Sequence, residues 1–263
     1  MPAVKIALLQ FDARERDRAG NLARVAAAAA EARREGASLL ALPELFASGY
    51  DLAAARAEAG WEREIERTAA LSREHSLAIV GSLLEPALPG SASPLPANCA
   101  ISWERGAERV RYRKAHRFAP LGECDHVRAG DALPAPVELA GLRVALAICY
   151  DLRFPELFRP AAVAGVDLFI VPAQWPAVRI AHWRALLVAR AIENQCFVLG
   201  VNRAGKYRDT LFGGSSLLVS PQGEIRVDAG DGEALRFGDV DPEEVRSWRA
   251  RFPALADRRV DLY

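Results

Sequence analysis

Three reactive side chains stand at the ends of three predicted strands. They are Glu44 after residues 38–42, Lys114 after residues 109–113, and Cys149 after residues 142–148. A thiol can act as a nucleophile, a carboxylate can take its proton, and an ammonium can stabilise the negative charge that develops on an attacked carbonyl. Reactive groups of α/β proteins gather where strands end. The shared pattern therefore predicts that these three side chains converge in one pocket.

Cys149 is predicted to lie at a turn between a buried strand and a helix. Residues 142–148 form a short apolar run with β-branched members, long enough for a strand and too short for an independent helix. Pro155 and Glu156 fit the first turn of a helix, which tolerates proline and favours a carboxylate. Backbone amides at such a turn can point at a developing negative charge. The alternative is a buried structural thiol, the commoner role of a lone cysteine.

The alternation of side chains along residues 109–113 predicts an inward direction for Lys114. One face carries Val110, Tyr112 and Lys114, and the other carries Arg109, Arg111 and Arg113. An inward ammonium is costly unless it is paired, so we expect a carboxylate and an anion-forming partner beside it. Taken singly, Lys114 also fits a solvated hairpin end, and Glu44 also fits the cap of a helix.

The composition is that of a globular domain with no strong electrostatic preference. The chain has 263 residues, of which 51% are hydrophobic and 26% are charged, and this excludes a disordered chain. The 34 basic residues equal the 34 acidic ones in number, so there is no net charge to attract nucleic acid or an anionic membrane. We therefore expect a small-molecule partner.

The N-terminus and the cysteines indicate a cytoplasmic setting. Met1 and Pro2 lead directly into a predicted strand without a basic leader or a cleavage site, so no secretory signal is expected. No apolar stretch approaches the roughly 20 residues that cross a bilayer. Cys99, Cys124 and Cys196 lie far from Cys149 and from one another, so neither a disulfide framework nor a zinc site is expected. We expect neither a metal nor a cofactor.

Strands and helices alternate along the chain. Strands are predicted at residues 4–10, 38–42, 77–84, 97–103, 109–113, 137–139, 142–148, 167–171, 196–202, 214–220 and 224–227. Helices are predicted at residues 21–35, 61–75, 155–164, 179–194 and 241–251. Residues 86–96 form a proline-rich loop, and residues 114–136 lack a clean periodicity. This order predicts a single α/β domain over residues 1–263, with its core at about residues 3–240 and a C-terminal helix and tail at 241–263.

The segments around the three reactive residues resemble the carbon–nitrogen hydrolase (nitrilase) superfamily. The matching stretches are Leu42-Pro-Glu44-Leu-Phe-Ala-Ser-Gly-Tyr50, Tyr112-Arg-Lys114-Ala-His116, Cys149-Tyr-Asp-Leu-Arg-Phe-Pro-Glu156-Leu, and His182-Trp183 with Arg190-Ala-Ile-Glu193-Asn194. The resemblance implies a four-layer α-β-β-α sandwich with mixed sheets and helices outside. It also implies a Glu-Lys-Cys triad and a homodimer or larger homo-oligomer.

The resemblance assigns a role to each member of the triad. Glu44 would take the proton of Cys149, whose thiolate attacks an amide carbonyl to form a thioester and release ammonia. Lys114 and the backbone amide after Cys149 would stabilise the oxyanion. The implied supporting and substrate-binding residues are Glu123, Arg153, Tyr50, Tyr150, Gln174 and Trp175.

The cysteine segment is similar to that of the ω-amidase branch, whose enzymes hydrolyse amides of α-keto acids such as α-ketoglutaramate and α-ketosuccinamate. Residues 171–176 are similar to the bacterial form of this branch. Arg153 would meet the substrate carboxylate as a bidentate fork, or it would pair with Glu156 or another local acid. A carboxylate-bearing small amide is therefore the expected substrate.

Several other functions stay open at this point. The same fold can serve a deaminated-glutathione amidase, an N-carbamoyl amidase or a nitrilase. Outside the family, Cys149 can work with His116, His126 or His182 as a Cys-His hydrolase. A metal hydrolase is disfavoured by the spacing of the four histidines. A catalytically silent scaffold is disfavoured by the inward lysine, and the tail from Asp239 to Tyr263 can either dock on a neighbouring subunit or be solvated.

Overall fold

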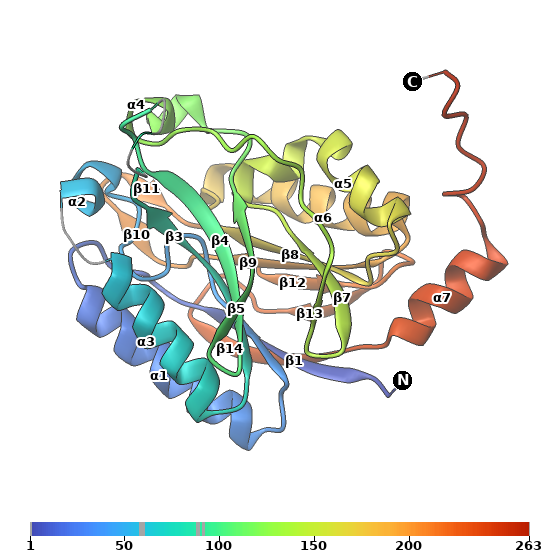
Figure 1. The fold of residues 1–263 in the computed structure, drawn as a ribbon, viewed down its shortest axis with the longest axis horizontal. Coiled ribbons are helices and arrows are strands. Elements are labelled where there is room, and N and C mark those ends of the chain that lie inside the picture. Colours follow the sequence, from blue (N-terminus) through green and yellow to red (C-terminus); the bar gives the residue numbers. More distant parts are fainter. Residues whose placement is uncertain (1, 58–60, 88–89, 91–92, 263) are drawn as a thin grey trace.

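The computed structural model describes residues 2–57, 61–87, 90 and 93–262, and within these ranges a pair of six-stranded sheets packs between helices (Figure 1). The first sheet has the order β14 (Ala234–Val240), β1 (Val4–Gln10), β2 (Leu39–Ala41), β3 (Ala78–Glu85), β4 (Ala97–Glu104) and β5 (Ala107–Arg113). The second has the order β13 (Ile225–Asp228), β12 (Leu217–Val219), β9 (Phe197–Asn202), β8 (Leu168–Ala173), β7 (Leu142–Leu146) and β6 (Val137–Leu139). The predicted fold class is confirmed.

Helices cover the outer faces of both sheets. Helices α1 (Arg18–Arg34) and α3 (Trp61–Glu74) lie on the first sheet, and α5 (Pro155–Val163) and α6 (Ile180–Asn194) lie on the second (Figure 1). Helix α7 (Pro242–Arg251) and the tail behind it extend away from the sheets (Figure 1). The short elements are α2 (Leu52–Ala57), α4 (Glu123–His126), the hairpin of β10 (Lys206–Tyr207) and β11 (Thr210–Leu211), and the 3₁₀ turns η1 (Ala119–Leu121), η2 (Cys149–Arg153) and η3 (Ala177–Arg179).

The central strands have uninterrupted apolar sequences because both of their faces are buried. In β1, Ile6 and Leu8 pack between the sheets together with residues of β7 and β8. Their neighbours Ala7 and Leu9 point the other way and pack in the layer that includes Val25 of α1. Alternate side chains of a strand point to opposite faces, so one strand supplies both cores.

Strand direction brings the reactive segments to one edge of the sandwich. Strands β1, β2 and β3 are parallel, and β5 runs with β3 because two antiparallel pairings separate them. Strands β7, β8 and β9 are also parallel. The backbone N–H of Glu44, beyond β2, donates to the carbonyl of Ala173 at the end of β8 at 3.4 Å. The ends of the two sheets are therefore joined where the candidate residues follow.

The predicted elements occur in the predicted order, with differences at several boundaries. Helix α1 begins at Arg18 because Asp17 caps it, accepting the N–H of Gly20 at 3.0 Å. The strands predicted over 142–148 and 214–220 are shorter, at Leu142–Leu146 and Leu217–Val219.

Some elements have no counterpart in the sequence prediction. Strand β14 is one, since its charged residues and glycine weaken the apolar alternation. The short helix α2 and the hairpin β10–β11 are others. The loop predicted at 86–96 lies partly outside the described residues. Within the described chain, no helix has the length and apolar character needed to cross a membrane.

Candidate active site

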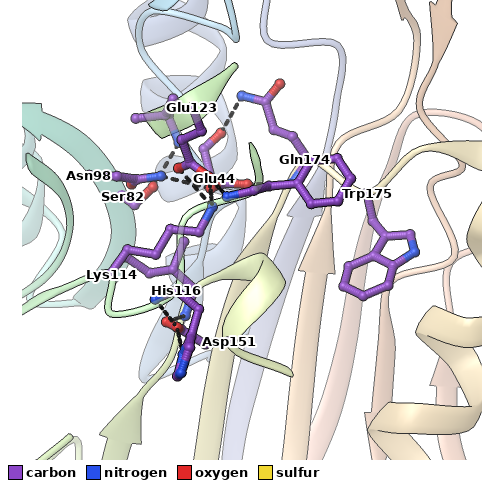
Figure 2. Close-up of polar contacts among 12 residues, drawn as sticks. Glu44, Ser82, Asn98, Lys114, His116, Glu123, Asp151, Gln174 and Trp175 are labelled. Carbon is purple, nitrogen blue, oxygen red and sulfur yellow. Dashed lines mark hydrogen bonds and ion pairs between the residues drawn. The ribbon is translucent and has the colours of Figure 1, made fainter. Parts of the chain in front are cut away.

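Lys114 is buried at the end of β5 between two carboxylates (Figure 2). Its Nζ lies 2.9 Å from Oε1 of Glu44 and 2.8 Å from Oε1 of Glu123, and it also lies 2.9 Å from Oε2 of Glu123. The side chain of Lys114 is 1% exposed, and both glutamates are fully buried. The predicted inward direction of Lys114 is confirmed, and the solvated hairpin end is excluded.

Every oxygen of the Glu44 side chain has a partner. Besides Lys114, Oε1 accepts the side-chain amide of Asn98 at 2.7 Å, and Oε2 accepts the backbone N–H of Gln174 at 2.9 Å. The side-chain amide of Gln174 in turn donates to the backbone carbonyl of Glu44 at 2.7 Å (Figure 2). Ser82 fixes the next residue by accepting the N–H of Leu45 at 2.8 Å. Glu44 is thus held by the neighbouring strands and does not cap a helix.

Glu123 begins the short helix α4 after Gly122, which adopts a positive φ of 73°. Its carboxylate holds Lys114 with both oxygens and also accepts the backbone N–H of Phe118 at 2.5 Å. The Glu123 side chain is fully buried, so it is not a solvated loop carboxylate. Two acids therefore share one ammonium, which leaves the cluster with one excess negative charge when all three groups are ionised.

Cys149 joins this cluster at the start of the 3₁₀ turn η2. Its thiol lies close enough to the cluster for the negative charge of Glu44 and the positive charge of Lys114 to act on its pKa. Cys149 has a φ of 46°, a left-handed conformation that L-residues seldom adopt and that costs free energy. The residue is 8% exposed. The first amides of a helical turn have no intrahelical partner, so N–H groups are available beside the sulfur.

Burial and the shared charges determine the protonation of the cluster. Burial raises the pKa of Glu44, the ammonium of Lys114 opposes that rise, and the negative charge of Glu123 adds to it. Burial also raises the pKa of Cys149 well above its usual value, and the Glu44 charge raises it further. Burial alone would lower the pKa of Lys114, but the carboxylates of Glu123 and Glu44 raise it well above normal. The resting cluster therefore holds a neutral thiol beside a charged Lys114.

A further buried acid, Asp151, joins the lysine strand to the cysteine turn. Asp151 accepts the hydroxyl of Tyr112 at 2.9 Å, the backbone N–H of Ile148 at 3.0 Å, and the backbone N–H of His116 at 2.9 Å. It also bonds to the ring Nδ1 of His116 at 2.9 Å (Figure 2). That ring stacks on Phe154 with centroids 3.7 Å apart. His116 is therefore engaged in holding the turn.

Arg203 is a buried cation that links two segments of the pocket wall. Its guanidinium donates to the side-chain oxygen of Gln174 at 3.0 Å and to Glu15 at 2.5 Å, and it also pairs with Asp12. Glu15 in turn accepts the backbone N–H of Tyr50 at 3.1 Å. The sequence alone does not single out Asn98, Ser82 or Arg203, because their roles depend on contacts with distant segments.

A pocket of about 290 Å³, counted with its open mouth, leads to Cys149. The wall contains the predicted residues Tyr50, Tyr150, Arg153, Gln174 and Trp175, and also Phe118, Pro176 and Arg179. Burial raises the pKa of Tyr50 well above normal, and the charge of Glu123 contributes to that rise.

A second hollow, of about 700 Å³, lies on the other side of Tyr50. It is lined by residues that include Asp51, His126, Arg208 and Phe212, and Cys149 is not among them. Cys149 therefore faces the smaller pocket. Among the described residues, no group of three His, Cys, Asp or Glu side chains is arranged to hold a metal ion.

Arg153 lies at the mouth of the smaller pocket. Its guanidinium donates to Nδ1 of His182 at 3.3 Å and lies 4.8 Å from the centroid of the Trp175 ring. Among the ion pairs of the described residues, none joins Arg153 to Glu156 or to another acid. The local ion pair that the sequence leaves open for Arg153 is therefore not formed.

The arrangement combines the groups needed for acyl transfer. The thiol of Cys149 lies near a carboxylate, that of Glu44, that can take its proton. A buried ammonium lies against that same carboxylate, and backbone amides begin a turn at the sulfur.

Comparison with known proteins gives the same superfamily throughout. The family profile described as carbon–nitrogen hydrolase matches residues 5–250. The 2-oxoglutaramate amidase of Bacillus subtilis is 34% identical over 235 residues, covering 86% of this chain and 87% of that protein. The omega-amidase YafV of Escherichia coli K12 is 34% identical over 262 residues, covering 98% of this chain and 97% of that protein.

A solved structure of similar fold carries a covalent adduct. It is a mutant of the amidase from Nesterenkonia sp. AN1, with the acetamide moiety of fluoroacetamide added at its active-site cysteine. The TM-score is 0.88 at 29% identity, and the match covers 98% of this chain and 95% of that one.

Proposed function

The chain belongs to the carbon–nitrogen hydrolase family and is an amide-hydrolysing enzyme, and from that premise we propose that Glu44, Lys114 and Cys149 form its catalytic triad. The observation that carries the proposal is the single buried cluster in which the Lys114 ammonium bonds to Glu44 and the Cys149 thiol lies close enough for both charges to act on its pKa. The most specific form of the proposal is an ω-amidase that acts on 2-oxoglutaramate (α-ketoglutaramate) or α-ketosuccinamate. The enzyme releases the acid and ammonia.

Acylation begins with a neutral thiol, because burial and the Glu44 charge oppose a free thiolate. Glu44 takes the proton as sulfur attacks the amide carbonyl, so charge moves from the carboxylate to the carbonyl oxygen. Lys114 and the backbone amide of Tyr150 stabilise that oxygen, and one such donor typically contributes about 10²- to 10³-fold in rate. The protonated Glu44 then donates its proton to the nitrogen, which leaves as ammonia.

Deacylation uses the same carboxylate. Once ammonia has left, Glu44 is ionised again and takes a proton from a water molecule that attacks the thioester. The second tetrahedral intermediate has its oxyanion at the same donors. Its collapse releases the acid and returns the proton to sulfur. Glu123 keeps Lys114 charged and in place through both half-reactions.

The substrate class is supported by the pocket and by the relatives. The pocket is small, and Arg153 lies at its mouth without an acid partner among the described residues. A substrate that carries its own carboxylate can supply that partner as a planar fork. Two of the relatives carry the names 2-oxoglutaramate amidase and omega-amidase.

Ammonia release from a panel of substrates tests the proposal. The panel contains 2-oxoglutaramate, α-ketosuccinamate, deaminated glutathione, glutamine, N-carbamoyl β-alanine and a simple nitrile, assayed in parallel. We expect the two α-keto acid amides to give the highest kcat/KM, and Cys149→Ala to abolish turnover of all of them. Equal or better turnover of deaminated glutathione would replace the substrate assignment and leave the triad unaffected.

A further inference from the structure

The pocket that leads to Cys149 carries two arginines and no carboxylate in its wall. Arg153 and Arg179 are both partly buried there, and the remaining lining residues are uncharged apart from the thiol. Among the described residues, neither guanidinium forms an ion pair. A cationic pocket wall of this kind attracts an anionic ligand.

These two arginines differ from buried arginines elsewhere in the protein. Arg203 pairs with Asp12 and Glu15, and Arg190 pairs with Glu193. Those cations have acid partners and stabilise the fold. Arg179, in contrast, makes no side-chain hydrogen bond to any other described residue. Its charge is therefore available to a ligand.

Aromatic rings hold both guanidinium groups. The guanidinium carbon of Arg153 lies 4.8 Å from the Trp175 ring centroid, and that of Arg179 lies 5.2 Å from the Phe118 ring centroid. A guanidinium on a ring face keeps its N–H edge free for a planar acceptor. The indole N–H of Trp175 also donates to the backbone carbonyl of Arg179 at 2.9 Å. The ring that supports Arg153 thus also fixes the backbone that carries Arg179.

We propose that Arg153 and Arg179 together form a clamp for the 2-oxo acid end of the substrate, and that Arg179 makes the enzyme select 2-oxo acid amides over 2-amino acid amides. This inference rests on the proposed function. A 2-oxo acid presents three acceptor oxygens in one conjugated plane, two on the carboxylate and one on the ketone. One arginine fork matches two of them, and a second donor is needed for the third.

The same two charges act against an amino acid amide such as glutamine. Glutamine replaces the ketone oxygen with an ammonium, which can only donate hydrogen bonds and repels a neighbouring guanidinium. In this wall no described carboxylate is present to compensate that ammonium. Selectivity therefore arises from a repulsive contact with the amino acid as well as an attractive one with the oxo acid.

Steady-state kinetics of Arg179→Gln and Arg179→Lys test the clamp. The substrates are 2-oxoglutaramate, glutaramate, which lacks the ketone, glutamine and butyramide, which has no charge. The matched control is Arg184→Gln on the helix that follows, α6, where the arginine pairs with Asp228 at 2.8 Å outside the pocket. Thermal unfolding of each variant shows whether it is folded.

Arg179→Gln should lower the ratio of kcat/KM for 2-oxoglutaramate to kcat/KM for butyramide by about 10- to 100-fold, the usual effect of losing a charged hydrogen bond. The preference for 2-oxoglutaramate over glutamine should fall by at least about 10-fold. Arg179→Lys should restore part of both kcat/KM ratios, because lysine keeps the positive charge but lacks the two-pronged guanidinium. Arg184→Gln should leave both ratios unchanged.

Two results would overturn the inference in different ways. If Arg179→Gln slows butyramide and 2-oxoglutaramate equally, or changes neither, Arg179 does not belong to a clamp and the proposed function remains. If the unaltered enzyme turns over 2-oxoglutaramate no faster than butyramide, the proposed substrate class is wrong, and the clamp fails with it.

Discussion

Replacing Glu123 with glutamine should shift the pH dependence of catalysis toward acid. Glu123 raises the pKa of Glu44 by repulsion and is the strongest of the charges that keep Lys114 protonated. The variant removes the repulsion and leaves Lys114 with Glu44 as its carboxylate. Both changes favour the ionised form of Glu44. The pKa of Glu44 therefore falls, and the enzyme keeps its base in the active form at lower pH.

The geometry gives the size of the effect. Oε1 of Glu44 and Oε1 of Glu123 bind the same Nζ, so they lie no farther apart than the two bond distances combined, about 5.7 Å. At an effective dielectric constant of about 20, two charges at that distance repel by about 3 kcal/mol, so the repulsion is large enough to be felt in the pH profile. We therefore expect the acid limb of kcat/KM to move to lower pH in the variant.

The assay is the pH profile of kcat/KM with butyramide, whose own charge does not change with pH. The acid limb of such a profile reports the base in the free enzyme. We expect kcat at neutral pH to fall by about 10²-fold, because Lys114 loses a ligand that orients it toward the oxyanion. Glu156→Gln, an exposed acid on α5, is the control and should leave the limb in place. An acid limb that stays fixed or moves up in Glu123→Gln would refute the coupling.

Three further predictions address the fold and the competing mechanisms. Replacing His116, His126 and His182 separately with glutamine should leave the acid limb of kcat/KM unchanged, and the loss of that limb in any of them would identify a Cys-His enzyme. Glu85→Gln should lower the free energy of unfolding, measured in urea, by about 2–3 kcal/mol, because three arginines lose a shared carboxylate. Burial favours a higher pKa of Glu85, but hydrogen bonds from Arg113 and Arg111 outweigh it and lower that pKa. The stability difference should therefore be full above pH about 4.5 and shrink as the pH falls through the lowered pKa. Arg203→Met should lower kcat/KM for butyramide by about 10-fold, because Gln174 loses the hydrogen bond that holds its side chain. Cys149 should still be acylated by the substrate in this variant.

The layers of the fold follow from the sequence where the pattern is strong. Buried runs such as residues 144–146 have no polar interruption, and alternation around Lys114 gives its direction correctly. Strand β14 cannot be found this way, because it is an edge strand that is stabilised by pairing with β1, far away in the sequence. Pairing of that kind depends on tertiary contacts and leaves little local signal.

In the candidate site, too, some residues could be predicted from the sequence and others could not. Residues at strand ends, such as Glu44 and Cys149, are recognisable because their type and position repeat a pattern. Asn98 and Arg179 cannot be recognised in this way. An asparagine inside a strand and an arginine before a helix are common on protein surfaces, so neither signals a functional role. Their roles depend on which distant side chain they contact. The assembly state and the cytoplasmic setting stay predictions.

Intact-mass spectrometry during turnover tests the central claim most directly. The unaltered enzyme is mixed with butyramide, quenched in acid within the first turnovers, and digested to locate any adduct. We predict a mass increase equal to one butyryl group on Cys149, with Cys99, Cys124 and Cys196 unmodified, and no adduct and no ammonia from Cys149→Ala. An acyl group on any other residue, or full-speed hydrolysis by Cys149→Ala, would contradict the account.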